Sequence, residues 1–382
     1  MKLIFAPDSF KGSLSAVEAA DILTRVTARH FPGTETVSIP VADGGEGTVD
    51  ALLCALGGQR MNARVTGPLF ETVNADWGLL PDGSAVIEMA RASGLPLVPE
   101  PLRDPRRTTS LGTGELVRAA LESGARRLMI GIGGSATNDG GMGLLAALGA
   151  VFADAAGQRL PPVGASLARV AGADFSGLIP ALAETEITVI CDVTNPLLGP
   201  EGAAAVYGPQ KGATPAICAE LEAGMARYAR VVGAAVGRDI ASFPGAGAAG
   251  GLGAALGGVL GAKLVPGVDA VLDAAGFDEK LRGADLVITG EGRIDAQSVR
   301  YGKVPAGVAR RCAARGVPVA VIAGGIGPGA EELYALCPGT MISTVPGPMT
   351  LEAAMEDAPA LLEAAADRLL RAVKIGMEIG GR

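Results

Sequence analysis

The residues best suited to chemistry in this chain are gathered in one glycine-rich run, residues 131–141. The run reads Gly-Ile-Gly-Gly-Ser-Ala-Thr-Asn-Asp-Gly-Gly, between an apolar segment at residues 127–130 and a predicted helix at residues 142–148. Glycine lets the backbone approach a ligand, and the N–H groups and dipole at a helix start favour negative charge. An isolated Gly-Gly pair would indicate only a tight turn. Five glycines with serine, threonine and aspartate instead predict a phosphate site.

Acidic residues follow the ends of four predicted strands elsewhere in the chain. These are Asp8, Asp43, Asp192 and Glu291. Because ligands of parallel sheets bind beyond the carboxyl ends of the strands, we expect these acids to serve a common purpose. Carboxylates near a phosphate loop are what magnesium and a hydroxyl-activating base require.

Each acid taken alone also has a structural explanation. Asp8 or Asp43 could cap the helix that follows it, and Asp192 could belong to an ordinary turn before Asn-Pro. Glu291 and a further acid close to it could simply pair with Arg293. The coincidence at four strand ends favours the functional interpretation.

Three basic side chains could bind phosphate or a substrate carboxylate: Lys11, Lys211 and Arg293. For Lys211, which lies in a Gly-Pro-Gln-Lys-Gly loop, a solvated loop lysine is the alternative. A second glycine-rich run, residues 244–253, indicates either a flexible phosphate or hinge loop or close packing on small residues. The chain has no G-x-x-x-x-G-K-[ST] run and no protein-kinase signature, so nucleotide binding uses another design.

The elements that must position these residues alternate between strand and helix, which predicts βαβ units and largely parallel sheets. Predicted strands are residues 2–6, 36–39, 127–131, 187–191, 285–289, 318–323 and 340–345. Predicted helices are residues 16–29, 47–56, 111–123, 215–232, 304–314, 330–335 and 351–374, the last broken or restarted at Pro359.

Residues 61–89 follow a different pattern, because apolar residues alternate there on both sides of a Pro-Asp-Gly turn. This pattern predicts antiparallel strands and indicates that the chain leaves its first domain near residue 60. The late strands then return to complete that domain. We therefore expect a discontinuous α/β domain of residues 1–60 plus 285–382 and an inserted α/β domain of residues 61–284.

Composition excludes several classes of protein. The 382 residues carry a net charge of −8 with acids and bases interspersed, which argues against nucleic-acid and membrane-surface partners. Residues 240–262 are uncharged but mostly glycine and alanine, so we expect no membrane span. The five scattered cysteines indicate a cytoplasmic protein. A single histidine, His30, argues against a Ser-His-Asp triad and excludes multi-histidine metal sites.

Taken together, these motifs resemble the bacterial glycerate kinase family from end to end. The matching segments are residues 6–16, 40–48, 131–141, 191–212, 244–253 and 286–298. The resemblance implies a flavodoxin-like parallel-sheet domain, an inserted α/β domain with some antiparallel strands, and an active site in the cleft between them. It also implies phosphorylation of D-glycerate that depends on ATP and Mg²⁺, with 2-phospho-D-glycerate as the product of this branch.

Our hypothesis for the site assigns roles by the physics of phosphoryl transfer, in which positioning and electrostatics supply most of the acceleration. The catalytic candidates are Asp8, Lys11, Asp43 and Arg293. The substrate- and phosphate-binding candidates are Ser13, Gly44, Gly45, Glu46, Gly133, Gly134, Ser135, Asn138, Asp139, Asn195 and Lys211. The metal-binding candidates are Asp192 and Glu291, with Asp295 as a further candidate.

Three alternatives remain open at this point. The acceptor could be another small hydroxy acid or a sugar, and the product could be the 3-phosphate. A non-catalytic anion sensor is a rival of another class, although acids at four strand ends would repel its ligand in the absence of a metal. The only partners we expect are the two small-molecule substrates, and the chain could act as a monomer or a homodimer.

Overall fold

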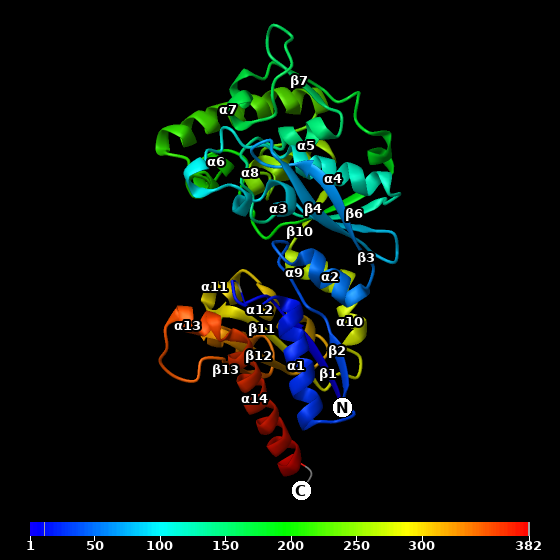
Figure 1. Cartoon of the computed structure of the whole chain (residues 1–382), viewed down its shortest axis with the longest axis vertical. Coiled ribbons are helices and arrows are strands. Elements are labelled where there is room, and N and C mark those ends of the chain that lie inside the picture. The colour runs from blue at the N-terminus through cyan, green and yellow to red at the C-terminus, as the bar shows by residue number, and fades with distance from the viewer. Residues whose placement is uncertain (11, 381–382) are drawn as a thin grey trace. The chain divides into compact units, whose positions relative to one another are not determined.

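The computed structural model describes residues 1–10 and 12–380, and its chain forms two compact units (Figure 1). The first unit contains Met1–Asp43, Asp50–Gly57 and the chain from Val268 onward. The second contains Gly44–Val49 and Gly58–Gly267. Our sequence-based division at residues 60 and 284 places residues 44–49 in the first domain and residues 268–284 in the second.

The first unit is built on a five-stranded sheet in which every neighbouring pair is parallel. Its strands lie in the order β13 (Gly339–Ser343), β12 (Val319–Ile326), β11 (Leu286–Ile294), β1 (Lys2–Pro7) and β2 (Glu35–Ser38). Numbered within this unit, the order is 2-1-3-4-5, which is the flavodoxin-like order. The predicted flavodoxin-like domain is therefore confirmed.

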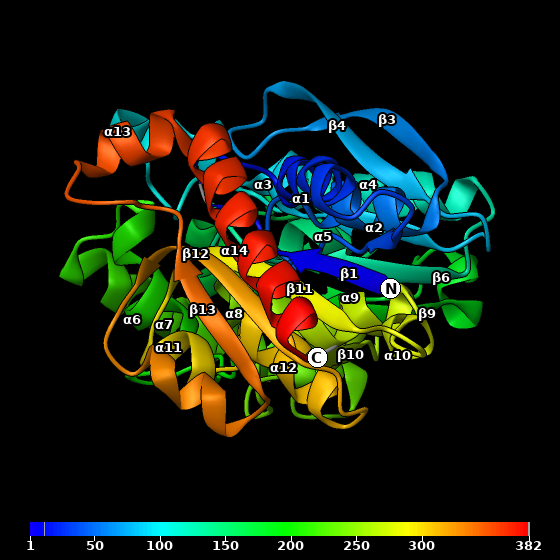
Figure 2. The ribbon, with the colours of Figure 1, turned by 90° about the horizontal axis from the view of Figure 1, so that it is seen from below.

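Two helices pack side by side on one face of this sheet, α1 (Ala16–His30) and α14 (Ala358–Gly380) (Figure 2). Their apolar faces, including Leu23 and Leu369, form one core with alternate strand residues such as Phe5. A capping box starts α1, since Ser15 and Glu18 bond each other's backbone N–H groups. Helix α12 (Val304–Ala313) packs against β1, β11 and β12.

The second unit is built on a mixed sheet of six strands. These lie in the order β10 (Lys263–Val265), β9 (Glu186–Ile190), β6 (Arg127–Gly131), β5 (Ala85–Glu88), β4 (Thr72–Leu79) and β3 (Gln59–Thr66). Strands β3, β4 and β5 pair antiparallel, as the alternating pattern predicts, whereas β5, β6, β9 and β10 are parallel. The carboxyl ends of the four parallel strands therefore lie at one edge of the sheet.

The remaining elements are short, apart from two helices of the second unit. Those two are α4 (Leu111–Glu122) and α7 (Pro215–Val236). The short helices are α2 (Thr48–Leu56), α3 (Ala90–Ser93), α5 (Met142–Ala147), α6 (Ala203–Tyr207), α8 (Ala248–Gly253), α9 (Gly267–Ala274), α10 (Phe277–Lys280), α11 (Ala296–Arg300) and α13 (Leu351–Glu356). The short strands β7 (Val151–Ala153) and β8 (Gly172–Asp174) form an antiparallel pair.

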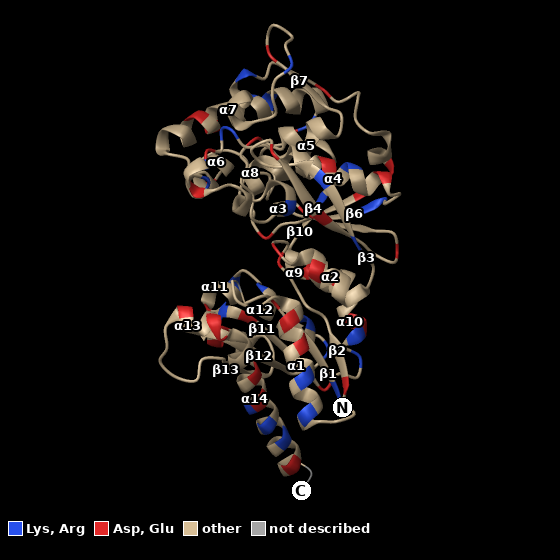
Figure 3. Cartoon of the chain, viewed as in Figure 1, with Lys and Arg blue, Asp and Glu red and all other residues tan. Residues whose placement is uncertain are grey.

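Two predicted helices differ in detail from the structure. The helix predicted at residues 351–374 is divided at Asp357, and Pro359 lies in the first turn of α14, where proline is tolerated. The helix predicted at residues 330–335 is a 3-10 helix, Ala330–Ala335. Acidic and basic residues are interspersed along both units (Figure 3). Within the described residues, every helix is too short or too polar to cross a membrane.

Candidate active site

Two buried carboxylates lie at neighbouring strand ends of the first unit. Strands β1 and β11 are adjacent, and the order of strands in the sheet reverses between them, which is where ligands of such sheets bind. Pro7 is in register with Gly290, so Asp8 and Glu291 directly follow this pair. Both are nearly buried, with exposed fractions of 7% and 6%. The expectation that acids at the carboxyl ends of parallel strands lie close together therefore holds for Asp8 and Glu291.

Arg293 and Asp295 lie slightly further along the same strand end. The Arg293 side chain is 69% exposed and pairs with Asp295 at 3.4 Å. Asp295 also caps α11, because its carboxylate accepts hydrogen bonds from the N–H groups of Gln297 and Ser298. These bonds lower the pKa of Asp295. The capping explains the acid at position 295, while Arg293 keeps an exposed guanidinium.

The first-strand loop carries two further candidates. Lys11 lies outside the described residues. The Ser13 hydroxyl donates to the carbonyl of Phe10 at 2.8 Å, within a short bridge between Phe10 and Leu14. This contact holds the turn closed before α1.

The Gly44–Val49 segment packs tightly onto strand ends of the second unit. The Gly133 N–H donates to the carbonyl of Gly44 at 3.3 Å. Gly44 has φ of +87°, and a side chain there would place its Cβ 2.3 Å from Ile190. A Cβ on Gly131 would lie 2.4 Å from the Gly44 carbonyl oxygen. Close contact with the Ile190 side chain at Gly44 and with the Gly44 backbone at Gly131 therefore requires glycine at these positions, and it fixes the segment next to the glycine-rich run.

At residues 134–137 of the glycine-rich run, three carbonyl groups are hydrogen-bonded while two N–H groups have no described partner. The carbonyl of Gly134 accepts from a backbone N–H at 2.8 Å, that of Ala136 from a threonine hydroxyl at 2.9 Å, and that of Thr137 from a lysine ammonium at 2.6 Å. By contrast, the N–H groups of Gly134 and Ser135 donate to none of the described residues. Gly134 is exposed and left-handed, with φ of +75°. Gly134 thus offers a donor on exposed backbone, whereas Ser135 is only 6% exposed. Backbone donors beside carbonyl groups that are already hydrogen-bonded are what an anion requires.

Asp139 has a structural role in place of the expected contact with phosphate. It has no exposed surface, and its carboxylate accepts from the N–H and hydroxyl of Ser110 and from the N–H groups of Gly141 and Gly143. Burial raises the pKa of Asp139, and these hydrogen bonds oppose the shift. Because its carboxylate occupies donors at the start of α5, that helix start is not the anion site.

Lys211 is buried rather than solvated. It ends the short 3-10 helix Pro209–Lys211 and is only 2% exposed. Its ammonium donates to the Ser135 hydroxyl at 2.7 Å and to the Thr137 carbonyl at 2.6 Å. Burial lowers the pKa of Lys211 to about 7, while the charge of Asp139 opposes the shift. Lys211 therefore supports the glycine-rich run from inside the unit.

The second glycine-rich run packs against the first. Ala249, Gly250 and Gly251 are all left-handed, with φ of 53°, 69° and 94°. The Gly140 N–H donates to the carbonyl of Gly250 at 3.0 Å, and a Cβ on Gly250 would lie 2.0 Å from the Thr137 carbonyl oxygen. This geometry is close packing on small residues, the second of the two interpretations of this run.

Asn138 lies at this packed junction and has no exposed surface. Neither atom of its side-chain amide forms a hydrogen bond with a described residue. Burial separates the side chain from the exposed part of the run at Gly134. Asn138 therefore reaches a ligand at that exposed part only if the run moves.

Asp192 and Asn195 follow β9. Asp192 is exposed, and its Oδ1 accepts from the N–H of Gly267, the first residue of α9, at 2.7 Å. Asn195 is half-buried; its amide donates to the Glu201 carbonyl at 2.8 Å and accepts from the Tyr207 hydroxyl at 2.6 Å. These bonds shape the loop after β9.

Glu88 is a residue at this edge that our sequence reasoning missed. It ends β5, is in register with Gly131, and is 1% exposed. Its Oε1 accepts from the N–H of Val49 at 2.8 Å. Its position as an acid at the carboxyl end of a strand is the signal that could have identified it. Residues 61–89 were interpreted as antiparallel strands, so Glu88 was not considered together with the acids that end parallel strands.

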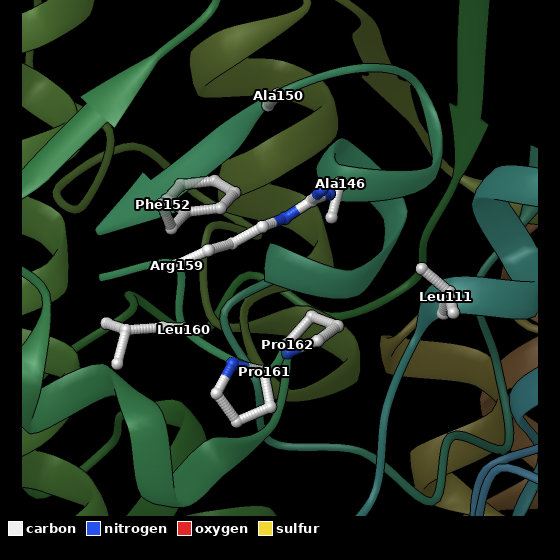
Figure 4. A pocket seen from close by; sticks show the side chains of 8 residues that line it. All are labelled: Leu111, Ala146, Ala150, Phe152, Arg159, Leu160, Pro161 and Pro162. Carbon is white, nitrogen blue, oxygen red and sulfur yellow. The ribbon is translucent and has the colours of Figure 1, made fainter. Parts of the chain in front are cut away.

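A pocket of about 450 Å³ lies in the second unit, away from these residues. Its lining is mostly apolar, and the Arg159 side chain extends across it (Figure 4). Because no candidate residue lines this pocket, it is separate from the predicted site. The described residues also contain no group of three or more histidine, cysteine or acidic side chains that could hold a metal ion.

Comparison with known proteins decides the family. The model of the glycerate kinase family matches residues 3–374. The chain belongs to the glycerate kinase family. Bacillus subtilis glycerate kinase is 49% identical to it, with 98% of both chains covered. Escherichia coli glycerate 2-kinase is 53% identical over 85% of this chain and 86% of that protein.

The fold of this glycerate kinase family member also has a solved counterpart. The crystal structure of "putative glycerate kinase 2" from Salmonella typhimurium LT2 is 45% identical, covers 99% of both chains and gives a TM-score of 0.90. The resemblance carried by the sequence motifs is thereby confirmed, as is the mixed α/β fold. As a member of a kinase family, the protein is a phosphotransferase with an alcohol group as acceptor.

Proposed function

We propose that this chain transfers the γ-phosphoryl group of ATP to the 2-hydroxyl of D-glycerate, giving ADP and 2-phospho-D-glycerate. The observation that carries the proposal is the glycine-rich run, in which the carbonyl groups of Gly134, Ala136 and Thr137 are hydrogen-bonded while the N–H groups of Gly134 and Ser135 have no described partner. Family membership supports the reaction class. The name of the Escherichia coli relative, glycerate 2-kinase, supports the position of the phosphate.

The proposed binding of ATP uses the backbone of the run at and beside its exposed residue, Gly134. The N–H groups of Gly134 and Ser135 bind phosphate oxygens, and Lys211 holds the run in shape from beneath. A preorganised loop loses little freedom when it binds, so its donors stabilise the charge that spreads over the transferred oxygens. The lysine charge adds to this stabilisation when Lys211 is protonated.

The proposed chemistry at glycerate uses the acids and the guanidinium. Asp8 or Asp43 orients the hydroxyl and accepts its proton as the oxygen attacks the γ-phosphorus, and the bond to the β–γ bridging oxygen breaks. Arg293, which is 69% exposed, binds the glycerate carboxylate or the transferring phosphoryl group. We propose Lys11, Ser13, Gly45 and Glu46 as further substrate contacts.

The proposed metal is Mg²⁺, which when bound would neutralise charge on the phosphates. Mg²⁺ is usually held by one or two carboxylates together with substrate phosphates and water. The two candidate ligands, Asp192 and Glu291, are hard oxygen donors of that kind, and Asp192 is exposed. The donor set therefore fits a metal that arrives with ATP. Asp295 is a weaker candidate because it caps α11.

The test is a panel of acceptors assayed for ADP release with ATP and Mg²⁺. D-glycerate should give a kcat/KM at least about tenfold above that of other small hydroxy acids and sugars, the size of a modest difference in pocket contacts. A sugar that outperforms glycerate would overturn the substrate, and ATP binding without turnover on any acceptor would favour a sensor. We further propose a cytoplasmic protein, supported by its five unpaired cysteines, acting as a monomer or homodimer.

A further inference from the structure

Glu88 is a buried carboxylate at the same sheet edge as the glycine-rich run. Its strand, β5, pairs with β6 so that Glu88 faces Gly131, and the N–H of the next residue donates to the Gly131 carbonyl at 2.9 Å. The Glu88 side chain is 1% exposed. A buried charge is costly unless it is paired and hydrogen-bonded, so its retention here requires an explanation.

The two carboxylate oxygens have separate partners. Oε1 accepts from the N–H of Val49 at 2.8 Å, and Oε2 accepts from Arg91 Nε at 3.0 Å. Arg91 also pairs with Asp76 at 3.4 Å, and Asp76 pairs with Arg60, which is 44% exposed. Alternating charges therefore run from the buried Glu88 to the surface and hold its carboxylate in place.

The bond to Val49 fixes the Gly44–Val49 segment at its far end. At its near end, the segment is fixed by the Gly133 N–H on the carbonyl of Gly44 at 3.3 Å. Inside it, the Thr48 hydroxyl donates to the carbonyl of Gly45 at 2.8 Å. The segment is thus held at both ends by residues that flank the ends of β5 and β6. It carries Gly44, Gly45 and Glu46 and directly follows Asp43.

We propose that Glu88 is a positioning residue that clamps the Gly44–Val49 segment and so places the substrate-contacting residues on it and beside it. The inference rests on the proposed function of that segment. Glu88 is not assigned a contact with substrate. Its effect on the reaction passes through the Val49 amide, because a small displacement of positioned groups reduces turnover steeply.

The experiment compares three variants of the full-length chain. Glu88→Leu keeps the volume but removes the acceptor, whereas Glu88→Gln keeps an oxygen that can accept from Val49. Glu115→Leu is the matched control, because Glu115 also accepts from a backbone N–H, that of Thr66 at 2.6 Å, in the same unit. We expect Glu88→Leu to lower kcat at least about tenfold with the KM for ATP within about threefold. Glu88→Gln should recover most of kcat, and the control should retain it.

A second measurement does not depend on activity. Amide hydrogen exchange of a peptide that covers residues 44–52 should be faster in Glu88→Leu than in the wild type and in Glu88→Gln. If Glu88→Leu fails to fold, Val49→Pro removes the donor instead, since proline is tolerated in the first turn of a helix. Val49→Pro should then show the same loss of kcat.

The outcomes separate the two proposals. A wild-type chain that does not phosphorylate D-glycerate would defeat the proposed function, while the exchange measurement would still test the clamp. Folded Glu88→Leu protein with kcat equal to that of the Glu115 control would overturn the positioning role. Unchanged exchange of residues 44–52 in Glu88→Leu would overturn the clamp itself.

Discussion

Replacing Gly250 with alanine tests whether the second glycine-rich run shapes the first. A Cβ at Gly250 would lie 2.0 Å from the Thr137 carbonyl oxygen and 2.7 Å from the Asn138 Cα. Both neighbours are main-chain atoms, so relief requires a backbone shift on the order of 1 Å to reach ordinary contact. That shift would disrupt the 2.6 Å bond between Lys211 and Thr137.

Gly237 is the matched control, because it has almost the same backbone conformation without the contact. Its φ is +71°, compared with +69° at Gly250, and nothing lies within 4 Å of a Cβ built on it. Gly237→Ala should therefore cost only the left-handed strain of about 1–2 kcal/mol. Gly250→Ala should cost the same strain and a further 1–3 kcal/mol or so from overpacking.

The assay has two parts, urea unfolding and steady-state kinetics. We expect the free energy of unfolding to fall by about 1–3 kcal/mol more in Gly250→Ala than in Gly237→Ala. Displacement of the run should also lower kcat/KM for ATP by about 100-fold in Gly250→Ala alone. Equal stability and equal kcat/KM in the two variants would refute the packing argument.

Three further predictions concern charged side chains. Burial holds the pKa of Lys211 near 7, below its value in the unfolded chain. The free energy of unfolding of the wild type, relative to that of Lys211→Met, should therefore rise as pH increases from about 7 to about 10. A fall in this relative free energy, measured by urea unfolding across that range, would contradict the burial argument. Asp139→Ala should cost at least about 3 kcal/mol, since it strands four buried donors, whereas Asp154→Ala at an exposed turn should cost clearly less. Asp192→Asn keeps an acceptor for Gly267 but should raise the Mg²⁺ concentration at half-maximal rate at least about fivefold, and an unchanged magnesium titration would remove Asp192 from the metal site.

Local patterns were sufficient to predict most elements of the two sheets. The strand predicted at residues 127–131 coincides with β6, and the alternation at residues 61–89 correctly predicted antiparallel pairing. Both signals depend on residues close together in the sequence, where periodicity reports directly on burial. The return of the chain to the first sheet was predicted because late strands followed an insertion with a different pattern.

Burial of individual side chains could not be predicted in the same way. Asp139 is held by Ser110, which is 29 positions earlier, and Lys211 is held by Ser135, which is 76 positions away. Sequence patterns place such residues near a loop but do not indicate whether they face solvent or the interior. The polar residues of the glycine-rich run were therefore assigned to phosphate, whereas Asp139 stabilises the run itself.

The central claim is tested most directly by identifying the product made from ATP, Mg²⁺ and D-glycerate with ³¹P NMR. The account predicts a 2-phosphoglycerate signal that grows in step with ADP. A 3-phosphoglycerate signal would contradict the proposed position of transfer while keeping the kinase. No phosphorylated product from protein that binds ATP would contradict the proposed function itself.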